Sequence, residues 1–475
     1  MTIRPPSPRR RLLRLLALLV GVVAAPMPGF GQERSQERSP EREPIIFADT
    51  QYEPVDWSDL DGWDGDDHAA AFAAFLNSCR ALDLKHRRER QLTAIPLALK
   101  DICERARQAI PLDEDGARRF FEENFRPIRI NRLGDRDGFL TGYYEPIIAG
   151  SRVPTGEFTA PLYRRPPNLV VSGWRRLGKD TFPSKGVLVG RRVGRRKIVP
   201  YYTRGEIEDG ALDGWHLEIC YLHDPVDVLF AQIQGSARIR LEDGTVLRVN
   251  YDSHNGWPYT PVGRVLVDNK IMTKDQVSMQ SLRDWMEANP DQAKEVRRQN
   301  KSYVFFRITE LDTEDEAIGG QGVGLAPGRS IAIDRALHAY GTPFFIEAQL
   351  PIANQKAETK FDRLVIAQDT GSAIVGPARA DIYFGAGDEA ARIAGRIKHA
   401  GDFAMLIPRE LDPVAAGRDM PLPPQRPSSF SFALGTMDDP TVDDPTADAA
   451  APPAEPAVAP AAAAAAAKGK ARQKK

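Results

Sequence analysis

Hydrophobic positions along the chain repeat with two different periods. In the first third, apolar residues recur every three to four positions, which predicts helices: one capped by Asp66 or Asp67, then helices over about 97–109 and 114–125. From about residue 127 the spacing changes to two, the spacing of half-buried strands. The pattern therefore predicts a mainly β protein with flanking helices.

The strand-like runs are short and rich in apolar residues. They are 139–144, 186–189, 197–201, 228–233, 237–241, 303–308, 330–333, 344–347 and 364–367. Asp243-Gly244 between two apolar runs is a strong hairpin signal. One helix is predicted inside this region, opened by the capping-box pair Thr273 and Gln276, and a last helix over about 389–399.

The two ends of the chain differ from its centre. Arginines near the start precede an apolar run over 15–25, which is the pattern of a signal peptide over 1–31, with an uncleaved anchor as the alternative. Residues 32–60 are interpreted as a flexible leader. Residues 411–475 are rich in proline and alanine and are interpreted as a disordered tail. The expected location is the periplasm.

Charge and cysteine content narrow the class of protein. The chain has 475 residues, with 64 Lys+Arg against 65 Asp+Glu, which argues against a nucleic-acid binder but leaves local basic patches open. Cys79 and Cys103 lie in helix-like sequence and can pair in an oxidising compartment, with unpaired core cysteines as the alternative. No cysteine or histidine spacing indicates a metal site.

Carboxylates at strand ends are the candidate catalytic groups. Asp369 ends a strand and enters a small-residue turn containing Gly371, and Asp381 follows among apolar and aromatic neighbours. Such neighbours desolvate a carboxyl, which raises its pKa and suits a general acid near neutral pH. Asp334 or Asp369 can orient that acid. Each aspartate alone is more simply a turn former or cap, but three in similar contexts favour an active site.

Other segments combine aromatic, amide and hydroxyl side chains, which suit the faces and hydroxyls of sugars. One is 138–146, with aromatic residues at a strand end. Another is 232–236, interpreted as a strand that delivers Gln234 to a bend, and a third is 255–259. Each is also explained as ordinary structure. The candidate substrate-binding residues are Thr141, Gly142, Tyr143, Tyr144, Glu145, Gln234, Gly235, Ser236 and Gly371.

Together these segments resemble the membrane-bound lytic murein transglycosylase A family. The aspartate set is similar to the three-aspartate domain of that family, and the resemblance covers about 110–410. The other residues that carry it are Gly142-Tyr143-Tyr144-Glu145-Pro146, Gln234-Gly235-Ser236, Asn255-Gly256, Tyr259, Gly263-Arg264 and Tyr303-Val304-Phe305-Phe306. The resemblance implies a double-psi β-barrel from 61–152 and 300–410. It also implies a second β domain inserted at 153–299, with a groove between the two.

The resemblance also implies a reaction. Such enzymes cleave the β-1,4 bond between N-acetylmuramic acid and N-acetylglucosamine without water and leave a 1,6-anhydro end, using no metal or organic cofactor. Asp381 would be the acid and then the base, supported by Asp369 and Asp334. The implied partner is the peptidoglycan glycan strand, bound by a monomer. Attachment to the envelope stays open, because no cysteine for lipid attachment follows the apolar run.

Two other functions remain as alternatives. One is an ordinary hydrolase in which a second carboxylate, with Glu145 as the candidate, activates water. The other is a non-catalytic glycan-binding or division-scaffold protein.

Overall fold

The computed structural model describes residues 50–86, 94–135, 137–172, 188–194, 197–312, 314–354, 356 and 358–412. The expected signal peptide and nearly all of the expected tail lie outside these residues. Part of the expected leader is ordered, since β1 (Thr50–Pro54) pairs with β2 (Phe125–Arg132). No helix within the described residues is long and apolar enough to cross a membrane.

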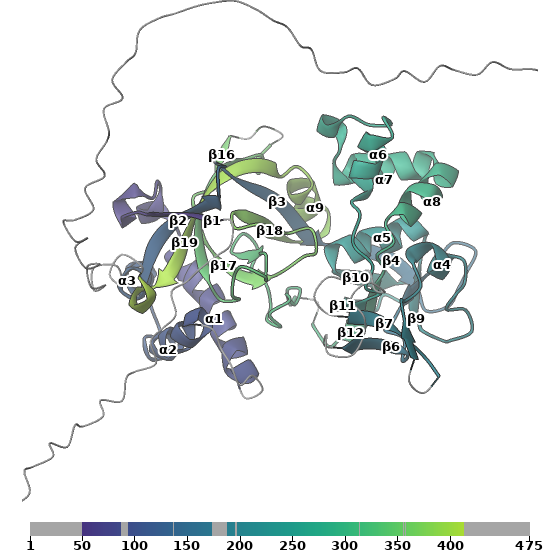
Figure 1. Cartoon of the computed structure of the whole chain (residues 1–475), viewed down its shortest axis with the longest axis horizontal. Helices are drawn as coiled ribbons and strands as arrows, with labels where there is room; N and C mark the ends of the chain where they lie inside the picture. The colour runs from purple at the N-terminus through teal and green to yellow at the C-terminus, as the bar shows by residue number, and fades with distance from the viewer. Residues whose placement is uncertain are drawn as a thin grey trace, which may run out of the picture. The chain divides into compact units, whose positions relative to one another are not determined.

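Six strands close into a barrel (Figure 1). The ring runs β19–β14–β17–β13–β18–β3 and returns to β19, and β2 and β1 extend it. Its strands are β3 (Gly138–Glu145), β13 (Ser330–Ala332), β14 (Pro343–Glu347), β17 (Arg363–Asp369), β18 (Arg379–Ala386) and β19 (Lys398–Pro408). The short pair β15 (Gln349–Leu350) and β16 (Thr359–Lys360) lies beside them. Leu140, Ile331 and Phe344 belong to the buried core of these strands.

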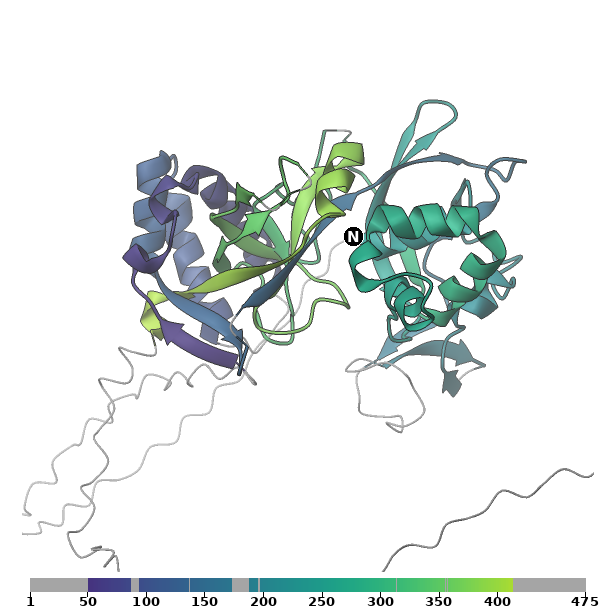
Figure 2. The same cartoon turned by 90° about the horizontal axis from the view of Figure 1, so that it is seen from above.

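Three helices pack against the barrel: α1 (His68–His86), α2 (Ala94–Gln108) and α3 (Glu114–Asn124). Both Figure 1 and Figure 2 show them beside the barrel strands. Asp67 caps α1 by accepting from the Ala70 amide at 2.9 Å. Cys79 and Cys103 form a disulfide between α1 and α2, whereas Cys220 is a buried free thiol.

A second sheet of six strands, in the order β12–β11–β10–β4–β9–β5, forms the core of the other half. Its strands are β4 (Ile147–Ser151), β5 (Ala160–Tyr163), β9 (Glu218–Leu222), β10 (Ser236–Leu241), β11 (Val246–His254) and β12 (Val304–Thr309). The hairpin predicted at Asp243-Gly244 is confirmed by the antiparallel pairing of β10 with β11. Because β4 and β12 belong to this sheet, the sheet extends beyond both ends of the range 153–299 that was expected for the inserted domain.

A three-stranded sheet and five helices accompany the second sheet. The strands are β6 (Leu169–Ser172), β7 (Leu188–Val193) and β8 (Lys197–Val199). The helices are α4 (Arg204–Glu208), α5 (Pro225–Gln234), α6 (Val262–Asp268), α7 (Met279–Ala288) and α8 (Pro290–Gln299). The mainly β fold with flanking helices is thus confirmed.

The strand expected over 228–233 is wrong, because this segment is the helix α5. Asp224 caps its first amides and Gly235, with φ 82°, ends it. Most sides of this helix are apolar because two of its faces pack against other elements. Val228 packs with the second sheet, whereas Leu229 packs with helices α6 to α8.

Two other expected helices begin or end elsewhere. The capping box at Thr273 opens only a single 3₁₀ turn, and Ser278 caps α7 instead. The last helix is α9 (Gly387–Ala394), and His399 lies in β19. That strand pairs with β3 and closes the barrel, so long-range pairing decides its conformation.

Candidate active site

Asp381 lies on β18, directly opposite Thr141 on the parallel strand β3. The Thr141 hydroxyl donates to its Oδ1 at 2.7 Å. Burial raises the pKa of Asp381 to about 6, although the Arg379 charge and the Thr141 hydrogen bond oppose this rise. The desolvation and raised pKa expected from the sequence are therefore found at this carboxyl.

Arg379 completes a chain of three polar groups. Its Nη2 donates to the Thr141 hydroxyl at 2.7 Å, and that hydroxyl donates in turn to Asp381. Its guanidinium lies 5.3 Å from the centre of the Phe139 ring. Sequence reasoning missed Arg379, although its position two residues before Asp381 places both side chains on one face of the strand.

Asp369 ends β17 and uses both carboxylate oxygens. Oδ2 accepts from the Tyr143 hydroxyl at 2.8 Å, while Oδ1 accepts from the amides of Gly320 and Thr370 at 2.7 and 2.8 Å. Burial raises the pKa of Asp369, against these hydrogen bonds. Its negative charge also raises the pKa of Asp381. Asp369 thus acts on Asp381 through its charge and holds the loop at Gly320 in place.

Asp334 lies two residues beyond Ala332, the β13 residue that pairs with Asp381. Its Oδ1 accepts from the Ala336 amide and its Oδ2 from the Gly376 amide, each at 2.9 Å. These contacts fasten the turn after β13 to the loop that precedes β18. The contacts of Asp334 are therefore those of a turn former.

The structure brings the segments around Tyr144 and Gln234 together. The Tyr144 amide donates to Gln234 Oε1 at 3.1 Å, and Gln234 is the last residue of α5. Gly235 then turns the chain into β10, which Ser236 begins. Gly142 meets a packing demand, since a Cβ there would lie 2.8 Å from the Ala394 Cα of α9. For Gly371, an added Cβ would lie 3.2 Å from the side chain of Ile374.

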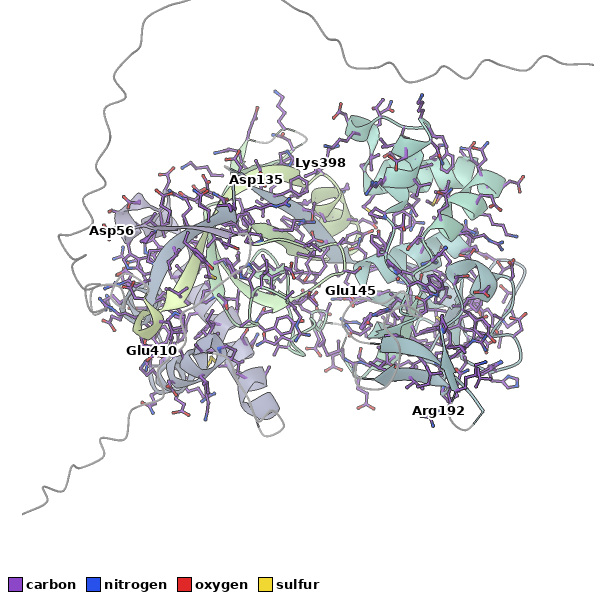
Figure 3. All side chains as sticks on the ribbon, viewed as in Figure 1. Asp56, Asp135, Glu145, Arg192, Lys398 and Glu410 are labelled. Atoms are coloured by element: carbon purple, nitrogen blue, oxygen red, sulfur yellow. A yellow bond between two sulfur atoms is a disulfide. The ribbon has the colours of Figure 1, made fainter. Side chains whose placement is uncertain are left out.

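Glu145, labelled in Figure 3, is only 1% exposed and is bound by two arginines. Arg238 Nε donates to it at 2.7 Å and Arg248 Nη2 at 3.0 Å. Both arginines belong to the second sheet, so the ion pairs join β3 to β10 and β11. A buried carboxylate held this way serves structure and is poorly placed to activate water.

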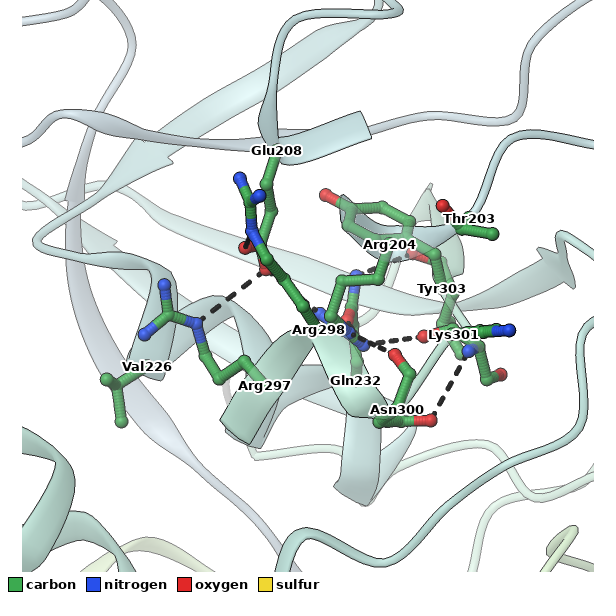
Figure 4. Close-up of polar contacts among 12 residues, drawn as sticks. Thr203, Arg204, Glu208, Val226, Gln232, Arg297, Arg298, Asn300, Lys301 and Tyr303 are labelled. Atoms are coloured by element: carbon green, nitrogen blue, oxygen red, sulfur yellow. Dashed lines mark hydrogen bonds and ion pairs between the residues drawn. The ribbon is translucent and has the colours of Figure 1, made fainter. Parts of the chain in front are cut away.

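A buried polar network holds α5 in position (Figure 4). Arg204 donates to Gln232 Oε1 at 2.6 Å and to the carbonyls of Asn300 and Ser302 at 3.1 and 2.8 Å. Gln232 Nε2 donates to the Val304 carbonyl at 3.0 Å. Because Gln234 is two residues further along the same helix, this network also fixes the helix end that reaches Tyr144.

Two substitutions should shift the pH profile in opposite directions for any reaction in which Asp381 is the acid. Arg379→Gln removes a charge that lowers the pKa of Asp381, so activity should persist to higher pH. Asp369→Asn removes a charge that raises this pKa, so the loss of activity with rising pH should begin at a lower pH than in the wild type. The measurement is initial rate against pH. Shifts of both variants in the same direction would show that Asp381 does not control the alkaline limb.

Among the described residues, no group of three or more His, Cys, Asp or Glu side chains is arranged to hold a metal ion. The contacts of the site are one chain of hydrogen bonds, Arg379 to Thr141 to Asp381, and the neighbouring Asp369–Tyr143 pair. Fold and site define a class of protein: a closed six-stranded β-barrel with an inserted β domain and a half-buried aspartic acid on a barrel strand.

Family comparisons agree with this architecture. A model described as "MltA specific insert domain" matches residues 139–307, and one described as "3D domain" matches 329–407. Membrane-bound lytic murein transglycosylase A of Escherichia coli K12 is 32% identical over 265 residues, which are 55% of this chain and 63% of the relative. The Vibrio cholerae protein is 30% identical over 275 residues, 56% of this chain and 65% of that protein. The matched region is thus less than two thirds of the length of these relatives.

Solved structures extend the match over more of the chain. The membrane-bound lytic murein transglycosylase of Agrobacterium tumefaciens has a TM-score of 0.68 and 34% identity, covering 78% of this chain and 99% of that one. MltA of Neisseria gonorrhoeae has a TM-score of 0.63 and 32% identity, covering 78% and 96%. The fold is shared with E. coli MltA with bound chitohexaose, at a TM-score of 0.53 and 24% identity over 77% and 95% of the two chains. The chain belongs to the membrane-bound lytic murein transglycosylase A family.

Proposed function

We propose that this protein is a lytic transglycosylase of peptidoglycan. It cleaves the β-1,4 bond between N-acetylmuramic acid and N-acetylglucosamine and leaves a 1,6-anhydromuramic acid end. The observation that carries the proposal is Asp381, a half-buried carboxyl that accepts from Thr141 and whose pKa is raised to about 6, while both oxygens of the neighbouring Asp369 already accept hydrogen bonds. Family membership supports the same reaction.

A single residue then serves as acid and base in turn. Protonated Asp381 gives its proton to the glycosidic oxygen as the bond from that oxygen to C1 of the muramic acid breaks. The 6-hydroxyl oxygen of the same sugar attacks C1, and its proton passes to the Asp381 carboxylate. The acid is thereby restored and no water is consumed. Thr141 would orient the Asp381 carboxyl throughout the reaction. Asp369 would act on it through its charge, and Asp334 would hold the loop that precedes β18.

The partners of the other carboxylates argue against ordinary hydrolysis. Hydrolysis of a glycoside usually needs a second carboxylate that activates water or attacks the sugar. Glu145 is bound by Arg238 and Arg248, and both oxygens of Asp369 accept hydrogen bonds. Transfer to the 6-hydroxyl avoids the need for a second base.

The glycan strand would lie against the barrel strand ends and the end of α5, in a groove between the two halves. Thr141, Tyr143, Tyr144 and Gln234 would line its path, with Gly142, Gly235, Ser236 and Gly371 shaping the backbone. The related E. coli structure with bound chitohexaose supports a β-linked amino-sugar chain as ligand. The disulfide between Cys79 and Cys103 supports an oxidising compartment such as the periplasm, and the protein would act there as a monomer.

Product masses test the proposal. Purified sacculi are digested in ¹⁸O-labelled water, and the released muropeptides are analysed by mass spectrometry. We expect anhydro ends, one water lighter than reducing ends, without ¹⁸O. Labelled reducing ends would establish hydrolysis instead, and binding to sacculi without release would establish a scaffold.

A further inference from the structure

Positive charge is concentrated in one part of this nearly neutral chain. The described residues of 164–172, 188–194 and 197–199 contain five basic side chains and no acidic one, while the whole chain carries a net charge of −1. We call the five the basic patch: Arg164, Arg165, Arg191, Arg192 and Lys197. Among the described residues, none of the five forms an ion pair with a carboxylate.

The small sheet β6–β7–β8 presents this charge. Its inner face is fixed to the protein, since Leu169 and Val189 are each only 4% exposed and belong to one core cluster. Side chains alternate along β7, so exposed Arg192 and its partner on β8, half-buried Ile198, lie on the face opposite to Val189. Figure 3 shows the Arg192 side chain on this sheet, pointing away from the core.

A hollow of about 560 Å³ lies at the edge of the sheet. Arg165 and Arg192 line it together with Asn168, Val170 and Val171. Two guanidinium groups at one hollow match the oxygens of a phosphate group, which arginine binds with two parallel hydrogen bonds.

Apolar and aromatic side chains accompany the arginines. Val171, which is 49% exposed, lines the hollow, and Val193, which is 42% exposed, lies on the same face of β7 as Arg191. Arg191 lies over the Tyr202 ring, at 4.3 Å from its centre. Exposed apolar groups beside arginine and tyrosine suit the headgroup region of a bilayer, where apolar groups enter the acyl boundary and cations meet phosphates.

We propose that the basic patch docks this protein on a membrane surface rich in anionic phospholipid, with lipid phosphates at Arg165 and Arg192. The peptidoglycan itself is a weaker candidate for this surface, because exposed valines offer little to a hydrated glycan. This attachment is independent of the proposed catalytic function and needs no covalent lipid.

Vesicle sedimentation tests the proposal with the full chain. The protein is mixed with vesicles of phosphatidylglycerol and phosphatidylcholine, or of phosphatidylcholine alone. We expect binding only to the anionic vesicles, and release by high salt. Arg165→Gln with Arg192→Gln should weaken binding about twenty-fivefold, because each basic residue near an anionic leaflet contributes roughly fivefold.

Controls separate the patch from general charge and from folding. Arg80→Gln with Arg119→Gln makes the same charge change on α1 and α3 and should bind like the wild type. Arg165→Lys with Arg192→Lys keeps the charge and should retain most binding. Muropeptide release from sacculi in solution should be unchanged in the Gln variant, so failure of this proposal is distinguishable from failure of the catalytic one.

Two results would overturn the proposal. One is equal binding of the wild type and the Gln variant to anionic vesicles. The other is loss of sacculus binding in that variant while vesicle binding stays intact, which would assign the patch to the cell wall.

Discussion

Asp381→Asn should reduce the release of anhydro-muropeptides from sacculi by about a thousandfold or more, since a positioned acid/base alone contributes 10²–10⁴. Asparagine keeps the size of the side chain and can still accept from Thr141, but its amide has no acidic proton to transfer. The measurement is the initial rate of release, followed by chromatography. Asp388→Asn is the matched control, because Asp388 is an exposed acid in the first turn of α9.

The stability of the same variant shows whether lost activity reflects lost folding. The folded-state pKa of Asp381 is above its unfolded value, so its contribution to stability is present at low pH and is lost as pH rises through about 6. Asparagine cannot ionise and avoids this loss. Asp381→Asn should therefore melt no lower than the wild type at about pH 8. An inactive variant that melts lower there would point to a structural role, and a fully active one would refute the assignment.

Local sequence was sufficient to predict a desolvated carboxyl at Asp381, but the strand β18 that carries it was not among the predicted strands. Apolar neighbours around Asp381 indicated desolvation, and the structure places it on a barrel strand with a raised pKa. The hairpin at Asp243-Gly244 was equally local, since two residues determine its turn. Strand periodicity also indicated most of the barrel, because one face of each strand packs in a core.

Features that depend on distant partners were not predictable. Residues 228–233 are apolar on most sides because a sheet and a helical cluster both cover them, and such a run has no period that separates helix from strand. Glu145 was a candidate for sugar binding or for activating water, and its two arginines lie about a hundred residues away. Arg379 was overlooked because its importance comes from Thr141 on another strand.

Asp66 also pairs with a residue distant in sequence, Arg329. Of the proposed substitutions, the removal of Asp66 should lower the free energy of unfolding most. Asp66 is 5% and Arg329 8% exposed, and the two form paired hydrogen bonds of 2.7 and 2.8 Å. Asp66 Oδ2 also accepts from the Leu364 amide at 2.7 Å. The carboxylate thus joins the start of α1 to the barrel near β13 and β17.

Asp66→Ala should lower the free energy of unfolding by about 3–5 kcal/mol, because it leaves a buried guanidinium without its counter-charge. Urea unfolding followed by tryptophan fluorescence measures the change. Asp64→Ala is the matched control: Asp64 pairs with Arg118 at 2.8 Å but is 86% exposed, so its loss should cost at most about 1 kcal/mol.

The double variant Asp66→Ala with Arg329→Met separates the two sources of that loss. If the cost of Asp66→Ala comes from an uncompensated charge, removing the charge as well should recover part of the stability. If the cost comes from the hydrogen bond to the Leu364 amide, the double variant should be no more stable than the single one. Equal stability of Asp66→Ala and Asp64→Ala would mean that the buried pair does not hold α1 on the barrel. Partial recovery would show that charge compensation, more than the backbone contact, fixes the helices beside the strands that carry Asp369 and Asp381.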